Sequence, residues 1–236
     1  MDDQLIQPDD EARVLATAGA TVTTHLWYVW TEVAMEHEWL AKRARRAYEA
    51  HGRDVASLEE EMKASLVTVA GVTHCLDALH NEAVDIGVLS DDTAERIKKR
   101  GMKAWTAVYR VLSETFGNPG LGSDVESELQ ELYRLRNEVV HQRPAPGEIV
   151  AHPALGMRTT PATARYTVER ATKALDLLFR ILSAIGTDHG DRPPKARAWA
   201  GMWRLSFKEL FARRGLEPRW ISFSDPASPC PDPSSD

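Results

Sequence analysis

The sequence predicts an all-α protein, built as an antiparallel helical bundle with an additional C-terminal helix and a disordered tail. In several long stretches, apolar residues recur at the spacing of an amphipathic helix. These stretches are separated by glycine, proline and polar clusters of the kind that end helices. No stretch shows convincingly the alternation of apolar and polar residues that is typical of a strand.

The 236 residues are expected to form one large domain, or a domain with an appendage. We expect a flexible N-terminus at residues 1–9, the helical bundle at 10–187, a linker and the extra helix at 188–214, and a disordered tail at 215–236. The helices themselves are expected at residues 10–50, 57–87, 92–116, 123–141, 160–185 and 196–214.

Short sequence signals indicate where these helices begin. Ser57 and Ser123 are each followed three residues later by a glutamate, which is the pattern of a capping box. Thr160 is followed by a proline, which is favoured in the first position of a helix. Residues 142–159 are rich in proline, glycine and alanine, and we expect them to form a long loop of the kind that often borders a functional site.

Composition narrows the class of protein. A net charge of −6 argues against broad, nonspecific coating of nucleic acid, although it leaves room for a local basic site. Cys75 and Cys230 provide neither a disulfide framework nor a paired-cysteine zinc signature, and they favour a reducing compartment. The N-terminus lacks the pattern of a secretory signal and no segment is apolar for long enough to span a bilayer, so we expect a cytoplasmic protein.

The helix expected at residues 123–141 carries the most unusual residue of the chain. Its apolar side consists of Val125, Leu129, Leu132, Tyr133, Leu135, Val139 and Val140. Arg136 falls near the middle of that side, where an unpaired guanidinium is costly unless it reaches water. Either its stem lies along apolar surface with its head in solvent, or it faces a cleft or a second subunit. His141 stands at the end of the same helix, where the helix dipole favours a histidine.

The run Arg136-Asn137-Glu138-Val139-Val140-His141 resembles the Arg-(four to six residues)-His motif of the HEPN superfamily, whose members are small α-helical domains and include many ribonucleases. The polar residue after the arginine and the aliphatic pair before the histidine fit that motif. The resemblance implies a bundle of HEPN type and a metal-independent endoribonuclease. It also implies a homodimer whose two motifs meet in a composite active site.

The resemblance further implies a role for each residue. In such an enzyme the RNA 2′-hydroxyl attacks the adjacent phosphate and leaves a 2′,3′-cyclic phosphate, so neither a metal nor another cofactor is expected. Arg136 would hold the phosphate oxygens, His141 would transfer a proton, and Asn137 would orient His141. Arg134 and Arg143 would add contacts to the substrate. The family also suggests a toxin or an anti-phage defence effector, which would need a neutralising protein partner.

Two other interpretations remain. Glu138 with His141, and Asp77 with His80, have the carboxylate-x-x-His spacing of dimetal helical bundles. However, the helical wheel places Glu138 and His141 opposite the apolar side of their helix, which argues against a metal site inside the bundle. Alternatively, the protein is a non-catalytic module that binds nucleotides, RNA or a protein, with the tryptophan-rich first and last helices as its working surface.

Overall fold

The computed structural model describes residues 25–51, 54–99, 101–117, 123–141, 148–187 and 192–216. Within these ranges the chain forms eight α-helices and one short antiparallel pair of strands, so the predicted all-α class is confirmed. The elements are α2 (Leu26–Ala50), α3 (Val55–Ile86), α4 (Asp91–Lys98), α5 (Ala104–Phe116), α6 (Ser123–His141), β1 (Val150–Ala151), β2 (Arg158–Thr159), α7 (Pro161–Arg165), α8 (Val168–Gly186) and α9 (Pro194–Arg213). Residues 1–9 and 217–236, for which flexible ends are predicted, lie outside the described ranges.

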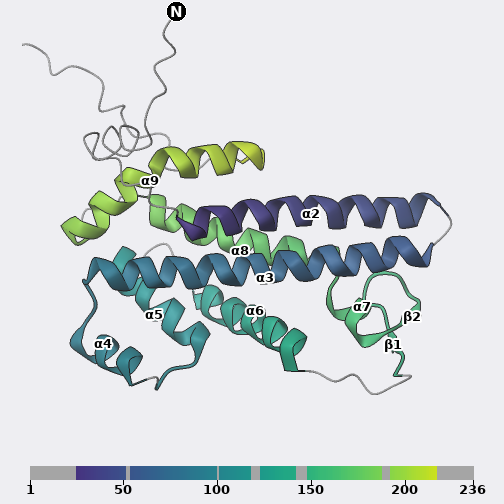
Figure 1. The fold of residues 1–236 in the computed structure, drawn as a ribbon, viewed down its shortest axis with the longest axis horizontal. Helices are drawn as coiled ribbons and strands as arrows, with labels where there is room; N and C mark the ends of the chain where they lie inside the picture. The colour runs from purple at the N-terminus through teal and green to yellow at the C-terminus, as the bar shows by residue number, and fades with distance from the viewer. Residues whose placement is uncertain are drawn as a thin grey trace, which may run out of the picture.

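The two longest helices, α2 and α3, form an antiparallel hairpin (Figure 1). Their contacts run in opposite order along the two helices: His25 with Glu82, Thr31 with Cys75, and Arg45 with Glu61. The two helices pack closely at Gly71. A Cβ atom on that residue would lie 3.2 Å from Ala34 Cβ and 3.3 Å from a backbone oxygen of α2. Gly71 therefore allows the two backbones to pack with almost no side chain between them.

Helix α3 lies at the centre of the molecule and contacts α2, α5, α6, α7, α8 and α9. Figure 1 shows α2 and α9 on one side of α3, and α5 and α6 on the other. The apolar side chains of these helices form one continuous core, with Leu76, Leu79, Leu129, Leu175, Leu178 and Ile181 among its fully buried members. The position of the motif helix α6 is therefore set by packing against α3 and its neighbours.

The last helix, α9, packs on the same core through an aromatic cluster. Trp27 of α2 lies against Trp199, Trp203 and Phe207 of α9, with ring centroids 5.2–6.3 Å apart. Trp27 and Phe207 are fully buried. These rings join α2 to α9 and contribute through the burial of large apolar surfaces and through edge-to-face contacts. Trp27, Trp199 and Trp203 are thus engaged in packing inside the chain, whereas Trp39 of α2 is 52% exposed.

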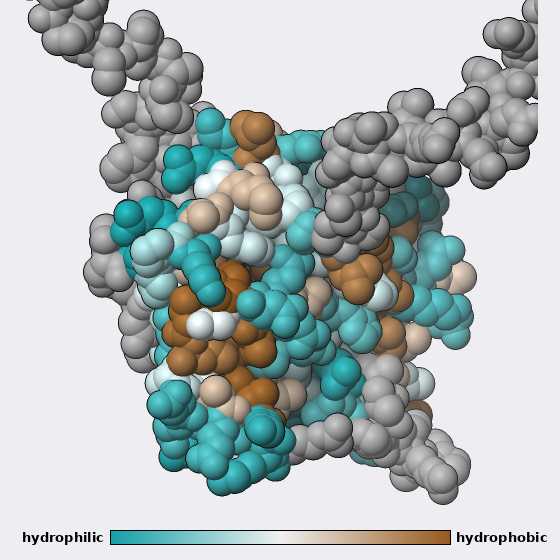
Figure 2. Space-filling model, turned by 60° about the vertical axis from the view of Figure 1, so that its left-hand side comes forward, coloured by the Kyte–Doolittle hydropathy of each residue, from teal (hydrophilic) through white to brown (hydrophobic). Residues whose placement is uncertain are grey.

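Figure 2 shows the face of the molecule on which α4 and the start of α9 lie. A patch of apolar residues on this face is surrounded by mostly hydrophilic residues. A hollow beside the last turns of α3 is lined by the apolar residues Leu26, Ala78, Ile86 and Trp199 and by the polar residues His25, Asn81, Glu82 and Asp85. The Glu82 carboxylate accepts hydrogen bonds from His25 and from the indole of Trp199, at 2.9 and 3.0 Å.

No helix in the described ranges is both long enough and apolar enough to span a membrane.

Several predicted helix boundaries are wrong. The single helix expected at residues 92–116 is two helices, α4 and α5, which fold back on each other. The Glu114 carboxylate of α5 accepts hydrogen bonds from the Ser90 amide and the Thr93 hydroxyl at the start of α4, at 2.9 and 2.5 Å. This contact bends the chain, and Gly101 lies at the break. Burial tends to raise the pKa of Glu114, but these hydrogen bonds lower it overall.

Two other boundaries also differ from the expectation. The N-cap of α3 is Asp54, whose carboxylate accepts hydrogen bonds from the backbone amides of Ala56 and Ser57. The helix therefore begins earlier than it would with Ser57 as its N-cap. The helix expected at residues 160–185 is interrupted at Tyr166, which ends α7 before α8 begins. The Thr160 cap itself is confirmed, because its hydroxyl accepts from the Thr163 amide.

The segment expected to be a structureless loop, 142–159, contains both β1 and β2. Val150 pairs with Thr159, and Ala151 pairs with Arg158. The two strands have only two residues each, which is too short for an alternating pattern to be visible in the sequence. The expectation that no strand is present is therefore wrong by this one short pair.

Candidate functional site

Helix α6 begins at Ser123, as its capping-box pattern predicts, and includes His141 as its last residue. Its predicted apolar side is buried as far as the structure describes it: Val125, Leu129, Leu132, Tyr133 and Leu135 are all at most 4% exposed. The side chains of Val139, Val140 and His141 lie outside the described residues. The helix therefore turns the side that contains Arg136 toward the body of the protein.

Two tyrosines fasten the second half of α6. Tyr133 donates a hydrogen bond to the Asp77 carboxylate of α3, with 2.5 Å between the oxygens. Tyr166, at the junction of α7 and α8, donates to the backbone carbonyl of Leu135 at 2.8 Å. Burial and the negative charge of Asp77 raise the pKa of Tyr133 well above its usual value, against the opposing effect of the Arg136 charge. Both phenols are thus neutral donors that hold this part of the helix in place.

Arg136 is half-buried beside this anchor. Its Nη1 lies 3.4 Å from the Asn137 side-chain oxygen, which accepts a long hydrogen bond. Within the described ranges Arg136 forms no ion pair. A guanidinium that is partly withdrawn from water and lacks a carboxylate is available to bind an anion.

Arg134 is in a different situation, although it is two residues away. It forms ion pairs with Glu131, at 2.6 Å, and with Glu138 on its own helix. The hydrogen bond from Arg134 lowers the pKa of Glu131. The Arg134 charge is therefore largely balanced by two carboxylates, whereas that of Arg136 is not.

Asn137 is exposed, and its side-chain oxygen accepts a hydrogen bond from Arg136. Its predicted role of orienting His141 concerns a side chain that lies outside the described residues, and the predicted substrate contact Arg143 lies outside them as well. The structure therefore brings together Arg136 and Asn137, and it adds Tyr133 and Asp77 as their support.

A hollow of about 580 Å³ opens beside Asn137, between the start of α5 and α6. It is lined by Lys103, which precedes α5, by Ala104 and Trp105 from α5, and by Gln130, Tyr133, Arg134, Asn137 and Glu138 from α6. Sequence reasoning missed the α5 residues because it placed them inside one continuous helix. The glycine at position 101 is the signal that indicates the break, since glycine is unfavourable within helices.

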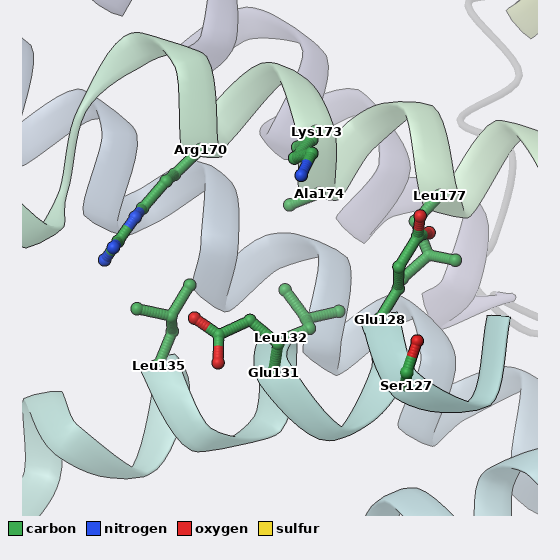
Figure 3. A pocket seen from close by; sticks show the side chains of 9 residues that line it. All are labelled: Ser127, Glu128, Glu131, Leu132, Leu135, Arg170, Lys173, Ala174 and Leu177. Carbon is green, nitrogen blue, oxygen red and sulfur yellow. The ribbon is translucent and has the colours of Figure 1, made fainter. Parts of the chain in front are cut away.

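A second hollow, of about 380 Å³, lies between α6 and α8 (Figure 3). Its apolar residues are Leu132, Leu135, Ala174 and Leu177, and its polar residues are Ser127, Glu128, Glu131, Arg170 and Lys173. Figure 3 shows Arg170 and Lys173 on α8 facing the side of α6 that carries Glu131. Lys173 forms no ion pair with any described residue, so this side of the motif helix also presents a cation without a fixed partner.

The geometry also bears on the metal interpretation. Among the described residues, no three His, Cys, Asp or Glu side chains lie close enough together to hold a metal ion. The Asp77 carboxylate is engaged by Tyr133. Glu138 is nevertheless only 15% exposed, because the side chains of Arg134 and Arg165 form ion pairs with it. Arg165 comes from α7, which the helical wheel of α6 cannot reveal.

The candidate site thus consists of Arg136 and Asn137, the anchor beneath them, and a hollow on either side of α6. Comparisons of the chain with protein-family models, with curated proteins and with solved structures found no significant match.

Proposed function

We propose that the protein is a metal-independent endoribonuclease of the HEPN type that cleaves RNA and leaves a 2′,3′-cyclic phosphate. The observation that carries this proposal is the state of Arg136, which is half-buried and has no carboxylate partner within the described ranges. A guanidinium presents paired N–H donors that match two oxygens of a phosphate. A phosphodiester therefore supplies the counter-charge that Arg136 lacks.

The reaction needs little from the protein beyond charge stabilisation and proton transfer. The 2′-oxygen loses its proton to a base and forms a bond to phosphorus, and the bond from phosphorus to the 5′-oxygen breaks as that oxygen takes up a proton. Arg136 stabilises the negative charge on the phosphate oxygens, and its bond to Asn137 limits its motion. In this scheme His141 transfers the protons, because a histidine side chain has a reference pKa near 6.5 and so exchanges protons readily at neutral pH.

The same reasoning favours a homodimer. The attack and the departure of the leaving group call for one base and one acid at the same time, and one imidazole cannot be both. Two copies of the motif helix that face each other provide two histidines and two arginines. Arg143 adds a substrate contact in this scheme, and Arg134 a weaker one because Glu131 and Glu138 already hold it.

The biological role that we propose follows from the HEPN resemblance. An unrestrained ribonuclease stops translation, which suits a cytoplasmic toxin or an anti-phage defence effector that a partner protein neutralises.

The test is cleavage of labelled single-stranded RNA in the presence of EDTA, with analysis of the product ends. We expect products that end in cyclic phosphate, and a loss of about 100- to 1,000-fold in rate for Arg136→Ala. His141→Ala should be similarly inactive. Arg180→Ala is the matched control, because Arg180 is an arginine on α8 that is already paired with Asp124 and Glu128; it should cleave at the rate of the unmodified protein.

Three outcomes would contradict the proposal. Cleavage that requires an added divalent metal would remove the metal-independent mechanism. Cleavage that survives both Arg136→Ala and His141→Ala would place the site elsewhere. RNA binding without any cleavage would instead support the non-catalytic binding module.

A further inference from the structure

We propose that the hollow between α5 and α6 binds one nucleobase of single-stranded RNA, beside the phosphate that Arg136 holds; this inference rests on the proposed ribonuclease function. The hollow has the size of a small-molecule site, at about 580 Å³. It is also the hollow that Asn137, the hydrogen-bond partner of Arg136, helps to line. Arg136 does not itself line the hollow, but a ligand that fills it contacts Asn137, whose side-chain oxygen accepts a hydrogen bond from Arg136.

The walls of the hollow supply the groups that recognise an unpaired base. Trp105 is half-buried at the start of α5 and offers an aromatic surface for stacking. Gln130 and Asn137 lie on the rim from α6, and each amide carries both a donor and an acceptor that can bond to a base edge. Stacking gives affinity for any base, whereas the amides discriminate among bases.

The charges around the hollow also fit a nucleotide. Lys103 is exposed on the rim and forms no ion pair with any described residue, so it can contact a neighbouring phosphate. Arg134 and Glu138 neutralise each other in the opposite wall. The net contribution of the lining is therefore positive, although the whole chain carries a charge of −6.

One residue that lines the hollow is held by a hydrogen bond to another helix. This residue is Tyr133, which is 1% exposed and has its hydroxyl held by Asp77. Because Tyr133 is already held in place, this part of the hollow loses little side-chain entropy when a ligand binds. By contrast, no described residue forms a hydrogen bond or an ion pair with the side-chain amide of Gln130 or the amine of Lys103.

The experiment measures the dissociation constants of 2′-O-methyl oligonucleotides of adenine, cytosine and uracil in EDTA, because these probes lack the attacking hydroxyl and cannot be cut. We expect the unmodified protein to prefer at least one base. Trp105→Ala should weaken its binding about tenfold or more, whereas Trp105→Phe should retain most of it. Gln130→Ala should reduce the difference between the bases. Trp39→Ala is the matched control, because Trp39 is a 52% exposed tryptophan on α2 and is not part of the hollow; its dissociation constants should not change.

Failure of this inference is distinguishable from failure of the proposed function. If RNA is cleaved in an Arg136-dependent manner but Trp105→Ala and Gln130→Ala bind all probes unchanged, the base site is wrong and the ribonuclease stands. If binding depends on Trp105 but no RNA is cleaved, the base site stands and the ribonuclease is wrong. If circular dichroism shows that Trp105→Ala has lost its fold, the exposed variants Gln130→Ala and Lys103→Ala decide the question. A protein that binds none of the probes overturns the inference.

Discussion

The phenol of Tyr133 on α6 donates a hydrogen bond to the carboxylate of Asp77 on α3, with 2.5 Å between the oxygens. This bond lies one helical turn before Arg136 and joins the candidate site to the central helix of the fold. Tyr133 also lines the hollow beside Asn137. One residue therefore supports both the arginine and the proposed base site.

Replacing Tyr133 by phenylalanine should test this support. The ring is kept, but Asp77 loses its donor in a partly buried place, so we expect the free energy of unfolding to fall by about 1–3 kcal/mol. Urea denaturation measures the change. Tyr48→Phe is the control: Tyr48 is also buried, but its hydroxyl donates only to the sulfur of Met157, a weak acceptor, and the loss should be smaller. Equal losses of unfolding free energy in the two variants would show that the hydrogen bond to Asp77 does not stabilise the protein more than the contact with Met157 does.

A buried ion pair fixes the far end of the α2–α3 hairpin. Arg45 binds both oxygens of Glu61, at 2.6 and 2.7 Å, and also reaches Glu169 of α8 at 2.7 Å. Because Glu61 is 1% exposed, Arg45→Met should leave a buried carboxylate without its cation and lower the free energy of unfolding by roughly 3–5 kcal/mol. The double variant Arg45→Met/Glu61→Gln removes both charges and should be more stable than Arg45→Met alone. A double variant that is less stable than the single one would contradict this explanation.

The close approach of α2 and α3 can be tested with two glycines. Gly201 of α9 has no atom within 4 Å of the place of a Cβ, so Gly201→Ala should raise the free energy of unfolding by about 0.5–1 kcal/mol through helix propensity. Gly71→Ala brings the same gain in propensity, but its Cβ would press on Ala34. We expect Gly71→Ala to be destabilising overall, because the backbone of α2 must move. Thermal or urea unfolding measures both changes. Similar stabilisation by the two substitutions would show that α2 and α3 can move apart without a loss of stability.

His152 should make the stability of the protein depend on pH. The ring is 3% exposed, and its Nδ1 accepts hydrogen bonds from the Ala154 and Leu155 amides, both at 3.2 Å. Burial lowers the pKa of His152, and the charge of Arg45 lowers it further, although Glu61 and Glu169 oppose this. The folded state therefore prefers the neutral ring, and the stabilisation is complete above about pH 6.5, the ordinary pKa of histidine. It should decline as the pH falls from that value toward the lower pKa of the folded state.

The matched variant for this prediction is His152→Asn, whose side-chain oxygen can accept from the same two amides but does not titrate in this range. Urea denaturation between pH 7.5 and pH 5.5 should show a smaller loss of stability for the variant than for the unmodified protein. If both lose the same free energy over this interval, other groups are responsible for the pH dependence.

Some features follow from local sequence and were predictable. The apolar side of α6 is buried where its spacing predicts, because a helix with one apolar side gains free energy only when that side leaves water. The Thr160 cap and the start of α6 at Ser123 depend on residues next to each other in the chain. Such signals act within one helical turn and need no knowledge of the rest of the fold.

Other features depend on residues far apart in the sequence and were not predictable. Glu114 draws α4 back onto α5, and Arg165 covers Glu138 from a different helix. The hollow beside Asn137 exists only because the start of α5 lies against α6. A helical wheel shows the direction of a side chain on its own helix, but it does not show what packs opposite.

The sequence by itself determined that the chain is helical, which sides of its helices are apolar, and that Arg136 interrupts one of them. The tertiary structure alone decided that Arg134 is balanced by two carboxylates, that Arg136 is half-buried without one among the described residues, and that an aromatic hollow lies beside it. The physical reason is range: helix propensity and amphipathicity act between neighbours in the chain, whereas charge pairing and burial depend on which helices meet.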